Sequence, residues 1–285
     1  MKILFLGGNR NFGKLVLKKL LKQNHKIFLI NRNNKKNLKH KNLKHINCER
    51  SKLYKVKNFL NTIRFDCVFD NIAYNLKDVI NLHKLLKNNF KHYIFTSSSI
   101  TYLHLNDNYD VKENDWIKGK LKKDWIRKKK YKLIDIHYAL NKRKIEKYLI
   151  SKKNICSTIL RVPNVIGKND FSFKTQKLLT YSINDNLINK NSFIQFVFIN
   201  DLVKAIIKII NKENKVSKIY NVANDKIKIN EFYNKVRKKK LLIKKYKSFS
   251  GKDFPIPVNS LINNKKIQKQ LNMRFSSIDR ILNLL

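Results

Sequence analysis

The chain has 285 residues, 42% of them hydrophobic, so it can bury a full core as one large domain or two small ones. No apolar stretch is long enough to span a bilayer, and the N-terminus lacks the pattern of a secretory leader, so we expect a cytoplasmic protein without a membrane partner. Its 64 lysines and arginines against 19 acidic residues give a net charge of +45.

This positive charge has two interpretations. It favours a nucleic-acid partner, because a strongly basic protein attracts any polyanion at low salt. Lysine, asparagine and isoleucine are also abundant together, and they share A/T-rich codons, so a biased genome would produce the same composition. We favour the second interpretation, because the lysines are spread along the whole chain. The three cysteines and seven histidines lack disulfide and metal-ligand spacing, and we expect no metal.

Apolar runs of strand length alternate with amphipathic stretches of helix length up to residue 162. This alternation predicts parallel strands joined by helical crossovers. Strands are predicted at residues 2–7, 26–31, 45–47, 65–72, 92–99 and 156–162, and helices at 12–23, 52–63, 76–88 and 137–150.

The pattern loosens after residue 163. It predicts helices near 170–183, 200–212 and 229–240, an apolar run at 193–199 and a strand at 218–223. We therefore predict an α/β protein with a Rossmann-like, doubly wound parallel sheet and a smaller C-terminal substrate lobe. The predicted domains are 1–165, with 196–222 folding back onto its sheet, and 166–285.

The stretch LGGNRNFG (6–13) connects the first predicted strand to the first predicted helix. Gly7 permits a tight turn there, and Gly13 permits close packing of the helix on the strand. The helix N-terminus offers backbone N–H groups to a phosphate. Arg10 stands where such loops usually carry a middle glycine. The alternative is a simple turn with no ligand.

The next predicted strand ends in LINRNN (29–34). Binders of NAD usually carry an acidic residue here for the adenosine ribose, whereas this chain has Asn31 and Arg32. Arg32 can pair with a 2′-phosphate, and Arg10 can reach the same region, so we favour NADP over NAD. Arg32 is also the residue that a basic surface loop would carry.

Three further side chains suit carbonyl and alcohol chemistry. Ser98 ends a predicted strand, and Tyr138 and Lys142 are four residues apart on one helix face. A free tyrosine has a pKa near 10, and a neighbouring ammonium favours the phenolate by about one to three pH units. Lys142 can supply this charge and hold ribose hydroxyls, while Ser98 donates a hydrogen bond to the substrate oxygen.

With these motifs the chain resembles the extended, atypical short-chain dehydrogenase/reductase superfamily and its NAD(P)-dependent epimerase/dehydratase group. LGGNRNFG is similar to the G-G-x-R-x-x-G loop of one branch, FTSSSITY (95–102) to the segment with the catalytic serine, and YALNKRKIEKYL (138–149) to the Y-x-x-x-K helix. The resemblance implies catalytic Ser98, Tyr138 and Lys142, and it implies cofactor contacts from Gly7, Gly8, Arg10, Phe12, Gly13, Asn31, Arg32, Glu49, Arg50, Asn71, Ala73 and Pro163.

The substrate contacts implied by the resemblance are Tyr102 and Asn164. Val162, Ile166 and Lys168 depart from the usual Pro, Tyr and Pro of the strand end near Asn164, which leaves the substrate pocket unassigned.

The resemblance implies an enzyme that transfers hydride between NADP or NAD and a substrate, with a nucleotide sugar as the substrate class, and a possible homodimer. The alternative is an RNA-binding protein on the same fold, because the same branch includes chloroplast stem-loop RNA-binding proteins. For that reading, the basic loop 117–132 with Trp116, Trp125 and Tyr131 offers a stacking surface. A third interpretation is a cofactor-bound scaffold with little turnover.

Overall fold

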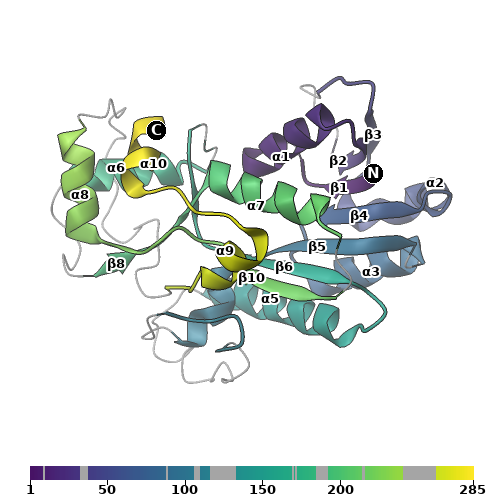
Figure 1. The fold of residues 1–285 in the computed structure, drawn as a ribbon. Helices are drawn as coiled ribbons and strands as arrows, with labels where there is room; N and C mark the ends of the chain where they lie inside the picture. Colours follow the sequence, from purple (N-terminus) through teal and green to yellow (C-terminus); the bar gives the residue numbers. More distant parts are fainter. Residues whose placement is uncertain are drawn as a thin grey trace.

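Seven parallel strands form the central sheet of the computed structural model, in the order β3-β2-β1-β4-β5-β6-β10 (Figure 1). The structure describes residues 1–8, 10–32, 38–87, 89–105, 110–115, 133–168, 170, 172–183, 192–213, 216–239 and 261–285. The strands are β1 (Lys2–Leu6), β2 (Lys26–Asn31), β3 (Leu43–Asn47), β4 (Phe65–Asp70), β5 (Phe90–Ser98), β6 (Ser157–Val162) and β10 (Lys218–Asn221). The prediction of a Rossmann-like sheet is confirmed.

The inner strands are apolar on both faces, as expected for a parallel sheet covered by helices. In β1, every residue after Lys2 is buried. The register aligns Leu6 with Ile30 on one side and with Asp70 on the other, and it aligns Ser98 with Val162. The carboxyl ends of these strands therefore lie along one edge of the sheet, where ligands bind in doubly wound folds.

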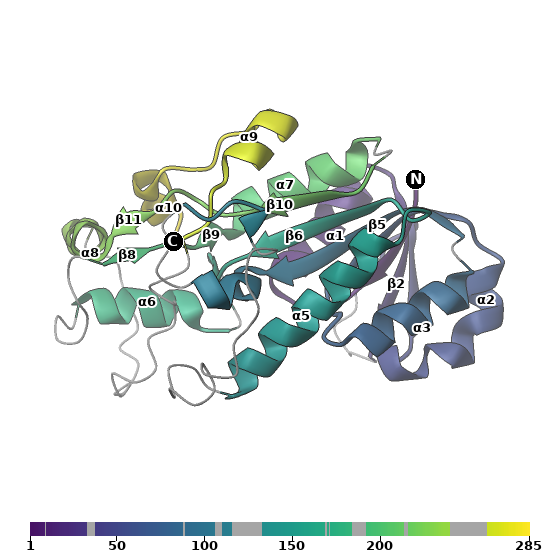
Figure 2. The same cartoon turned by 90° about the horizontal axis from the view of Figure 1, so that it is seen from below.

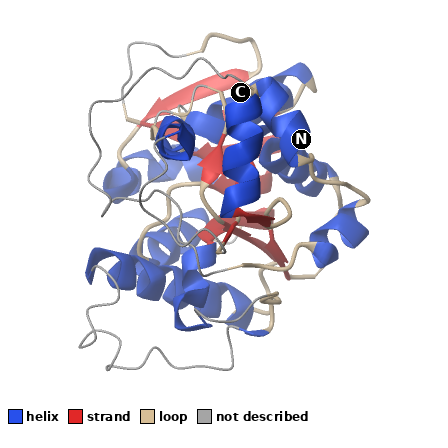
Figure 3. Cartoon of the chain, turned by 90° about the vertical axis from the view of Figure 1, so that its left-hand side faces the viewer, coloured by secondary structure: helices blue, strands red, loops and turns tan. Residues whose placement is uncertain are grey.

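Helices cover the two faces of the sheet (Figure 2). The two helices α1 (Asn11–Lys22) and α7 (Ile199–Asn211) pack against each other on one face. On the other face lie α2 (Lys57–Asn61), α3 (Leu76–Leu86) and α5 (Leu133–Ser151), with the 3-10 helices η1 (Arg50–Val56) and η2 (Ser99–Leu105) beside them. Figure 3 shows helices on both sides of the strands.

The C-terminal lobe is built from short elements. Its helices α6 (Lys174–Ile183) and α10 (Ile278–Leu284) both pack on α8 (Ile229–Lys238), while α9 (Lys265–Leu271) packs on β10. Two small sheets pair β7 (Val165–Ile166) with β9 (Val197–Phe198), and β8 (Phe193–Ile194) with β11 (Ile227–Lys228).

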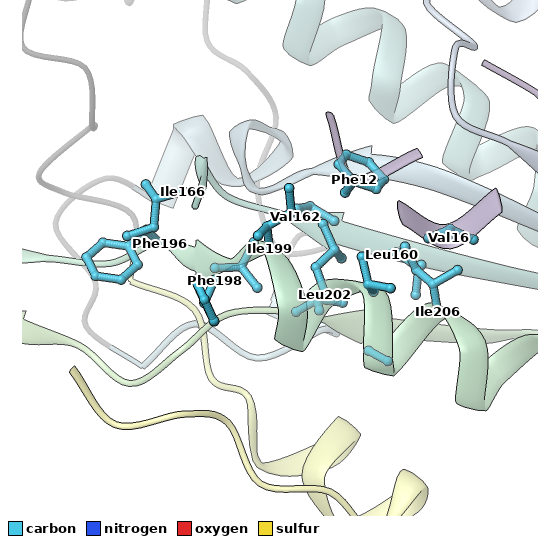
Figure 4. Packing of buried hydrophobic residues seen from close by; sticks show 14 of the residues in the cluster. Phe12, Val16, Leu160, Val162, Ile166, Phe196, Phe198, Ile199, Leu202 and Ile206 are labelled. Carbon is cyan, nitrogen blue, oxygen red and sulfur yellow. The ribbon is translucent and has the colours of Figure 1, made fainter. Parts of the chain in front are cut away.

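One hydrophobic cluster runs from the sheet into this lobe (Figure 4). It joins Val16 and Leu160 at the sheet to Ile166 and Phe196 in the lobe. The domain division at residue 165 stays a prediction, and the hydrophobic core crosses it without a break.

Two segments differ from the sequence prediction. Residues 52–63 form η1 and α2 with a kink at Lys52, and only Leu53 and Leu60 are buried there, which is little burial to hold one regular helix. The run 193–199 divides into β8 and β9, because Gln195 between them bonds its side chain to the backbone of Asn224 and Ile262.

Candidate active site

A cavity of about 1610 Å³ opens at the carboxyl edge of the sheet. The ends of β1, β2, β4, β5 and β6, together with α5 and the start of α6, contribute to its wall. Sequence-predicted residues in the lining are Gly7, Arg10, Phe12, Asn31, Arg32, Glu49, Arg50, Asn71, Ser98, Tyr138, Lys142, Pro163 and Asn164. The structure therefore gathers most of the predicted site around one space.

The loop after β1 shapes one end of the cavity. Gly7 has a φ of +89°, and a Cβ there would lie 2.4 Å from Ile72 Cγ2. A Cβ on Gly13 would lie 2.6 Å from the Gly7 carbonyl oxygen, which Asn71 Nδ2 also contacts at 3.3 Å. Only glycine allows this turn and this close approach of α1, so the N-terminus of α1 faces the cavity.

Unsatisfied buried polar atoms line the same space. The amide of Asn31 at the end of β2, Asn11 Oδ1 on α1 and Thr96 Oγ1 on β5 are buried without a hydrogen-bond partner in the described residues. Buried polar atoms are normally paired, so orphaned ones around a cavity indicate a polar ligand. These atoms suit a dinucleotide, since they are spread along the carboxyl edge of the sheet from the end of β2, past the glycine loop, to the end of β5.

The part of the cavity beside the end of β2 and the start of α1 has two exposed arginines. Arg10 and Arg32 line it beside the exposed Glu49, and the structure describes no ion pair for either arginine. Arg50 differs. Its Nη1 and Nη2 donate to the two oxygens of buried Asp70, each at 2.6 Å, so its charge is already neutralised. Arg50 stiffens the cavity wall, and its Nε is buried without a hydrogen-bond partner in the described residues, so its contact with a cofactor stays a prediction.

Ser98, Tyr138 and Lys142 all line the cavity. The Ser98 hydroxyl lies close enough to the Tyr138 phenol to lower its pKa. Lys142 Nζ donates to the carbonyl oxygens of Ala73 at 2.9 Å and Thr96 at 2.8 Å, and it lies 5.5 Å from the centre of the Tyr138 ring. An ammonium has three N–H donors, so one remains for a ligand.

The electrostatics correct one expectation. Burial raises the pKa of Tyr138 to about 12, with a smaller contribution from Tyr74, although the Ser98 hydrogen bond lowers it. Burial also lowers the pKa of Lys142 to about 8. The expected net lowering of the Tyr138 pKa is therefore wrong for this structure, because desolvation of the phenolate dominates.

Tyr102 is a second correction. Its side chain is completely buried away from the cavity, where its hydroxyl donates to Asn221 Oδ1 at 2.8 Å and accepts from Arg161. It packs with Val111, Ala223 and Ile262 in a small cluster. The prediction that Tyr102 contacts substrate is wrong, because the 3-10 helix after Ser98 turns the ring into the core.

Three predicted cofactor residues stand behind the cavity wall. Gly8 faces Leu29 and Phe5, Gly13 packs on the loop, and Ala73 holds Lys142 through its carbonyl oxygen. None of the three lines the cavity, so each shapes the site through its neighbours.

A buried ion pair fixes the elements that carry the catalytic candidates. Arg161 on β6 donates to Glu146 on α5 through Nε at 3.2 and 3.1 Å and through Nη2 at 2.6 Å. Ser97 Oγ, next to Ser98, donates to the same carboxylate at 2.5 Å. Glu146 lies one turn beyond Lys142, so this cluster links β5, α5 and β6.

A comparison of the sequence with protein families gives one match. A model described as "NAD dependent epimerase/dehydratase family" matches residues 71–223, more than half of the chain. The chain belongs to this family. Its matched segment contains Ser98, Tyr138, Lys142 and both members of the Arg161–Glu146 pair. No curated protein matches the sequence.

Several solved structures share this fold. Vestitone reductase from alfalfa (Medicago sativa L.) has a TM-score of 0.74 and 15% identity over 99% of this chain and 96% of that one. The Bordetella bronchiseptica enzyme WbmH in complex with NAD+ gives 0.72 and 15% over 99% and 96%. UDP-glucose 4-epimerase from Thermotoga maritima with UDP-glucose gives 0.71 and 15% over 100% and 97%.

Other predictions lie outside what the structure describes. The loop 117–132, with Trp116, Trp125 and Tyr131, falls outside the described residues, and the comparisons give the RNA-binding interpretation no support. In the described part of the chain, no helix combines the length and apolar character of a membrane span. No cluster of three or more potential metal ligands occurs there either.

Proposed function

We propose that this chain is an NAD(P)-dependent oxidoreductase of the epimerase, dehydratase or reductase type, with Ser98, Tyr138 and Lys142 as its catalytic residues. The observation that carries the proposal is that all three line one cavity, with Ser98 next to the Tyr138 phenol and Lys142 anchored by two carbonyl oxygens beside the phenol ring.

The cofactor would lie along the carboxyl edge of the sheet, from the end of β2 across the glycine loop to the end of β5. Gly7 and the N-terminus of α1 would hold its pyrophosphate, and the orphaned amide of Asn31 would bond the adenosine ribose. The third N–H of Lys142 would bond the second ribose. Bound NAD(P) supplies the hydride acceptor or donor at this place.

Tyr138 moves the proton. Because its pKa is about 12, the phenol is protonated at neutral pH and is ready to act as a general acid toward a carbonyl oxygen. Ser98 donates a second hydrogen bond to that oxygen as negative charge develops on it. In the reverse direction the same phenol, once deprotonated, accepts the hydroxyl proton of a substrate alcohol.

NADP is the proposed cofactor of the two. Arg10 and Arg32 are exposed at the adenosine end and no described ion pair occupies them, so their guanidinium groups are available for a 2′-phosphate. Glu49 on the same rim is the opposing feature, since a carboxylate favours an unmodified ribose.

A nucleotide sugar is the proposed substrate class. Its support is the family of the chain and its similarity to a UDP-glucose 4-epimerase solved with UDP-glucose. The cavity is large enough for a second ligand beside the dinucleotide and extends to Asn164 and Lys174 on the lobe side.

The test is turnover by wild-type protein and by Tyr138→Phe with NADP+, NAD+ and a panel of UDP-, GDP- and dTDP-sugars. The account expects wild-type turnover of at least one sugar and a loss of kcat of about 10²- to 10⁴-fold in the variant, with cofactor affinity retained. Equal turnover by both proteins would remove Tyr138 from the mechanism. Absence of dinucleotide binding in the wild type would remove the proposed function itself.

A further inference from the structure

Lys174 brings a positive charge into the lobe side of the cavity. It is the first residue of α6, it is half-buried, and it lines the cavity opposite the dinucleotide loop. Its Nζ donates to Asn164 Oδ1 at 2.6 Å. This bond joins Lys174 to the residue that the sequence predicted to face the substrate.

The ammonium of Lys174 lacks an ionic partner in the described part of the chain. Asp170 is near, but its oxygens accept from Ser172 and from the backbone and hydroxyl of Thr175, so it caps the start of α6. Asp135 on α5 also faces the cavity, and it influences Lys174 without forming an ion pair. Burial lowers the pKa of Lys174, and these two carboxylates offset that effect only in part.

The other cavity cations have different surroundings. Lys142 is bonded to two carbonyl oxygens and Arg50 to Asp70, while Arg10 and Arg32 belong to the adenosine end. Among the residues that the structure describes, Lys174 therefore carries the positive charge at the substrate end. A partly desolvated cation without a counter-ion is costly unless a ligand supplies the negative charge.

We propose that Lys174 is a specificity residue that binds an anionic group of the substrate, either a diphosphate oxygen or a carboxylate on the sugar. The inference rests on the proposed function and extends it to a recognition residue. Asn164 holds the ammonium in place through its side-chain oxygen, so that two of the three N–H groups of Lys174 are left for the anion.

The experiment compares ligand affinities at physiological salt for wild type, Lys174→Met, Lys174→Arg and a control, Lys168→Met. Lys168 is exposed, lies in the same connection and does not line the cavity. Calorimetry would measure uridine against UDP, thymidine against dTDP, guanosine against GDP, and UDP-glucose against UDP-glucuronic acid. NADP+ and NAD+ affinities are measured on the same samples.

Lys174→Met should weaken by about 10- to 100-fold every ligand that carries the bound anion, the loss expected for one charge-assisted hydrogen bond. The nucleosides and the dinucleotides should bind unchanged, and Lys174→Arg should recover most of the loss. An equal loss for the nucleoside diphosphates and for both UDP-sugars identifies the diphosphate as the bound anion. A loss confined to UDP-glucuronic acid identifies the sugar carboxylate.

The proposal is overturned if Lys174→Met matches Lys168→Met for every ligand. It is also overturned if the wild type binds UDP, dTDP and GDP no more tightly than their nucleosides, and UDP-glucuronic acid no more tightly than UDP-glucose. Failure of the proposed function has a different signature, because neither dinucleotide would then bind to the wild type.

Discussion

Replacing Arg161 tests whether the buried ion pair holds the catalytic elements together. Arg161 and Glu146 are both fully buried, with 0% of either side chain exposed. In Arg161→Met the Glu146 carboxylate keeps Ser97 as a donor but loses the three hydrogen bonds from the guanidinium. An uncompensated buried charge costs about 3–5 kcal/mol, so the free energy of unfolding should fall by that amount.

A double variant separates the cost of an unpaired buried charge from the cost of lost packing. Arg161→Met combined with Glu146→Leu removes both charges and leaves neutral groups without these partners, chiefly the Ser97 hydroxyl and the Glu113 carbonyl oxygen. We expect a loss of about 1–3 kcal/mol, smaller than that of Arg161→Met alone. Urea unfolding followed by circular dichroism measures all variants, with equal slopes as the check on comparability. Additive losses, or an Arg161→Met variant within about 1 kcal/mol of wild type, would refute the reasoning.

Three further predictions concern other parts of the molecule. Burial lowers the pKa of His83 and His92 from 6.5 to about 4, so the unfolded chain binds their protons first and stability should fall as the pH drops through this range. The loss of unfolding free energy is about 3 kcal/mol for each histidine. Urea unfolding at a series of pH values should show a smaller loss for His92→Gln than for wild type. An identical loss would count against a lowered pKa of His92. Gly7→Ala should lower the free energy of unfolding by more than about 1 kcal/mol in thermal or urea unfolding, because of its left-handed φ of +89°, and an unchanged value would be unexpected. Arg32→Ala combined with Arg10→Ala should weaken NADP+ binding at least about tenfold and change NAD+ binding little, as calorimetry can show; equal weakening of both would exclude a 2′-phosphate role.

The sheet was predictable from the sequence because its signal is local. Each strand is a short apolar run followed by an amphipathic stretch, and parallel packing makes such runs buried on both faces. The positions of Tyr138 and Lys142 were predictable for the same reason, since a separation of four residues on a helix fixes their common face. Gly7 and Gly13 were recognisable because a strand and a helix flank them.

Partners that are distant in sequence were not predictable in this way. Arg50 has the charge expected of a cofactor contact, and only the fold reveals that Asp70, twenty residues later, takes up that charge. Tyr102 fits a substrate motif by spacing, yet the turn after Ser98 directs it inward. For the buried ion pair the sequence did contain a signal. Arg161 is a charged residue in the apolar strand β6, and such a residue requires a buried counter-charge.

The same limit applies to the pKa of Tyr138. Spacing predicts that Lys142 is a neighbour, but the direction of the Tyr138 pKa change depends on how deeply the fold buries the phenol. Lys174 was missed altogether, because its place in the cavity depends on how the lobe packs against the sheet.

The most direct test of the account is titration of the wild-type protein with NADP+ and NAD+ at physiological salt, where nonspecific attraction to a strongly basic surface is largely screened. Calorimetry should give one site per chain, with NADP+ bound more tightly than NAD+. Heats that vanish as the salt rises, or that show no saturable site for either dinucleotide, would contradict the claim that this cavity holds a nicotinamide cofactor above Tyr138.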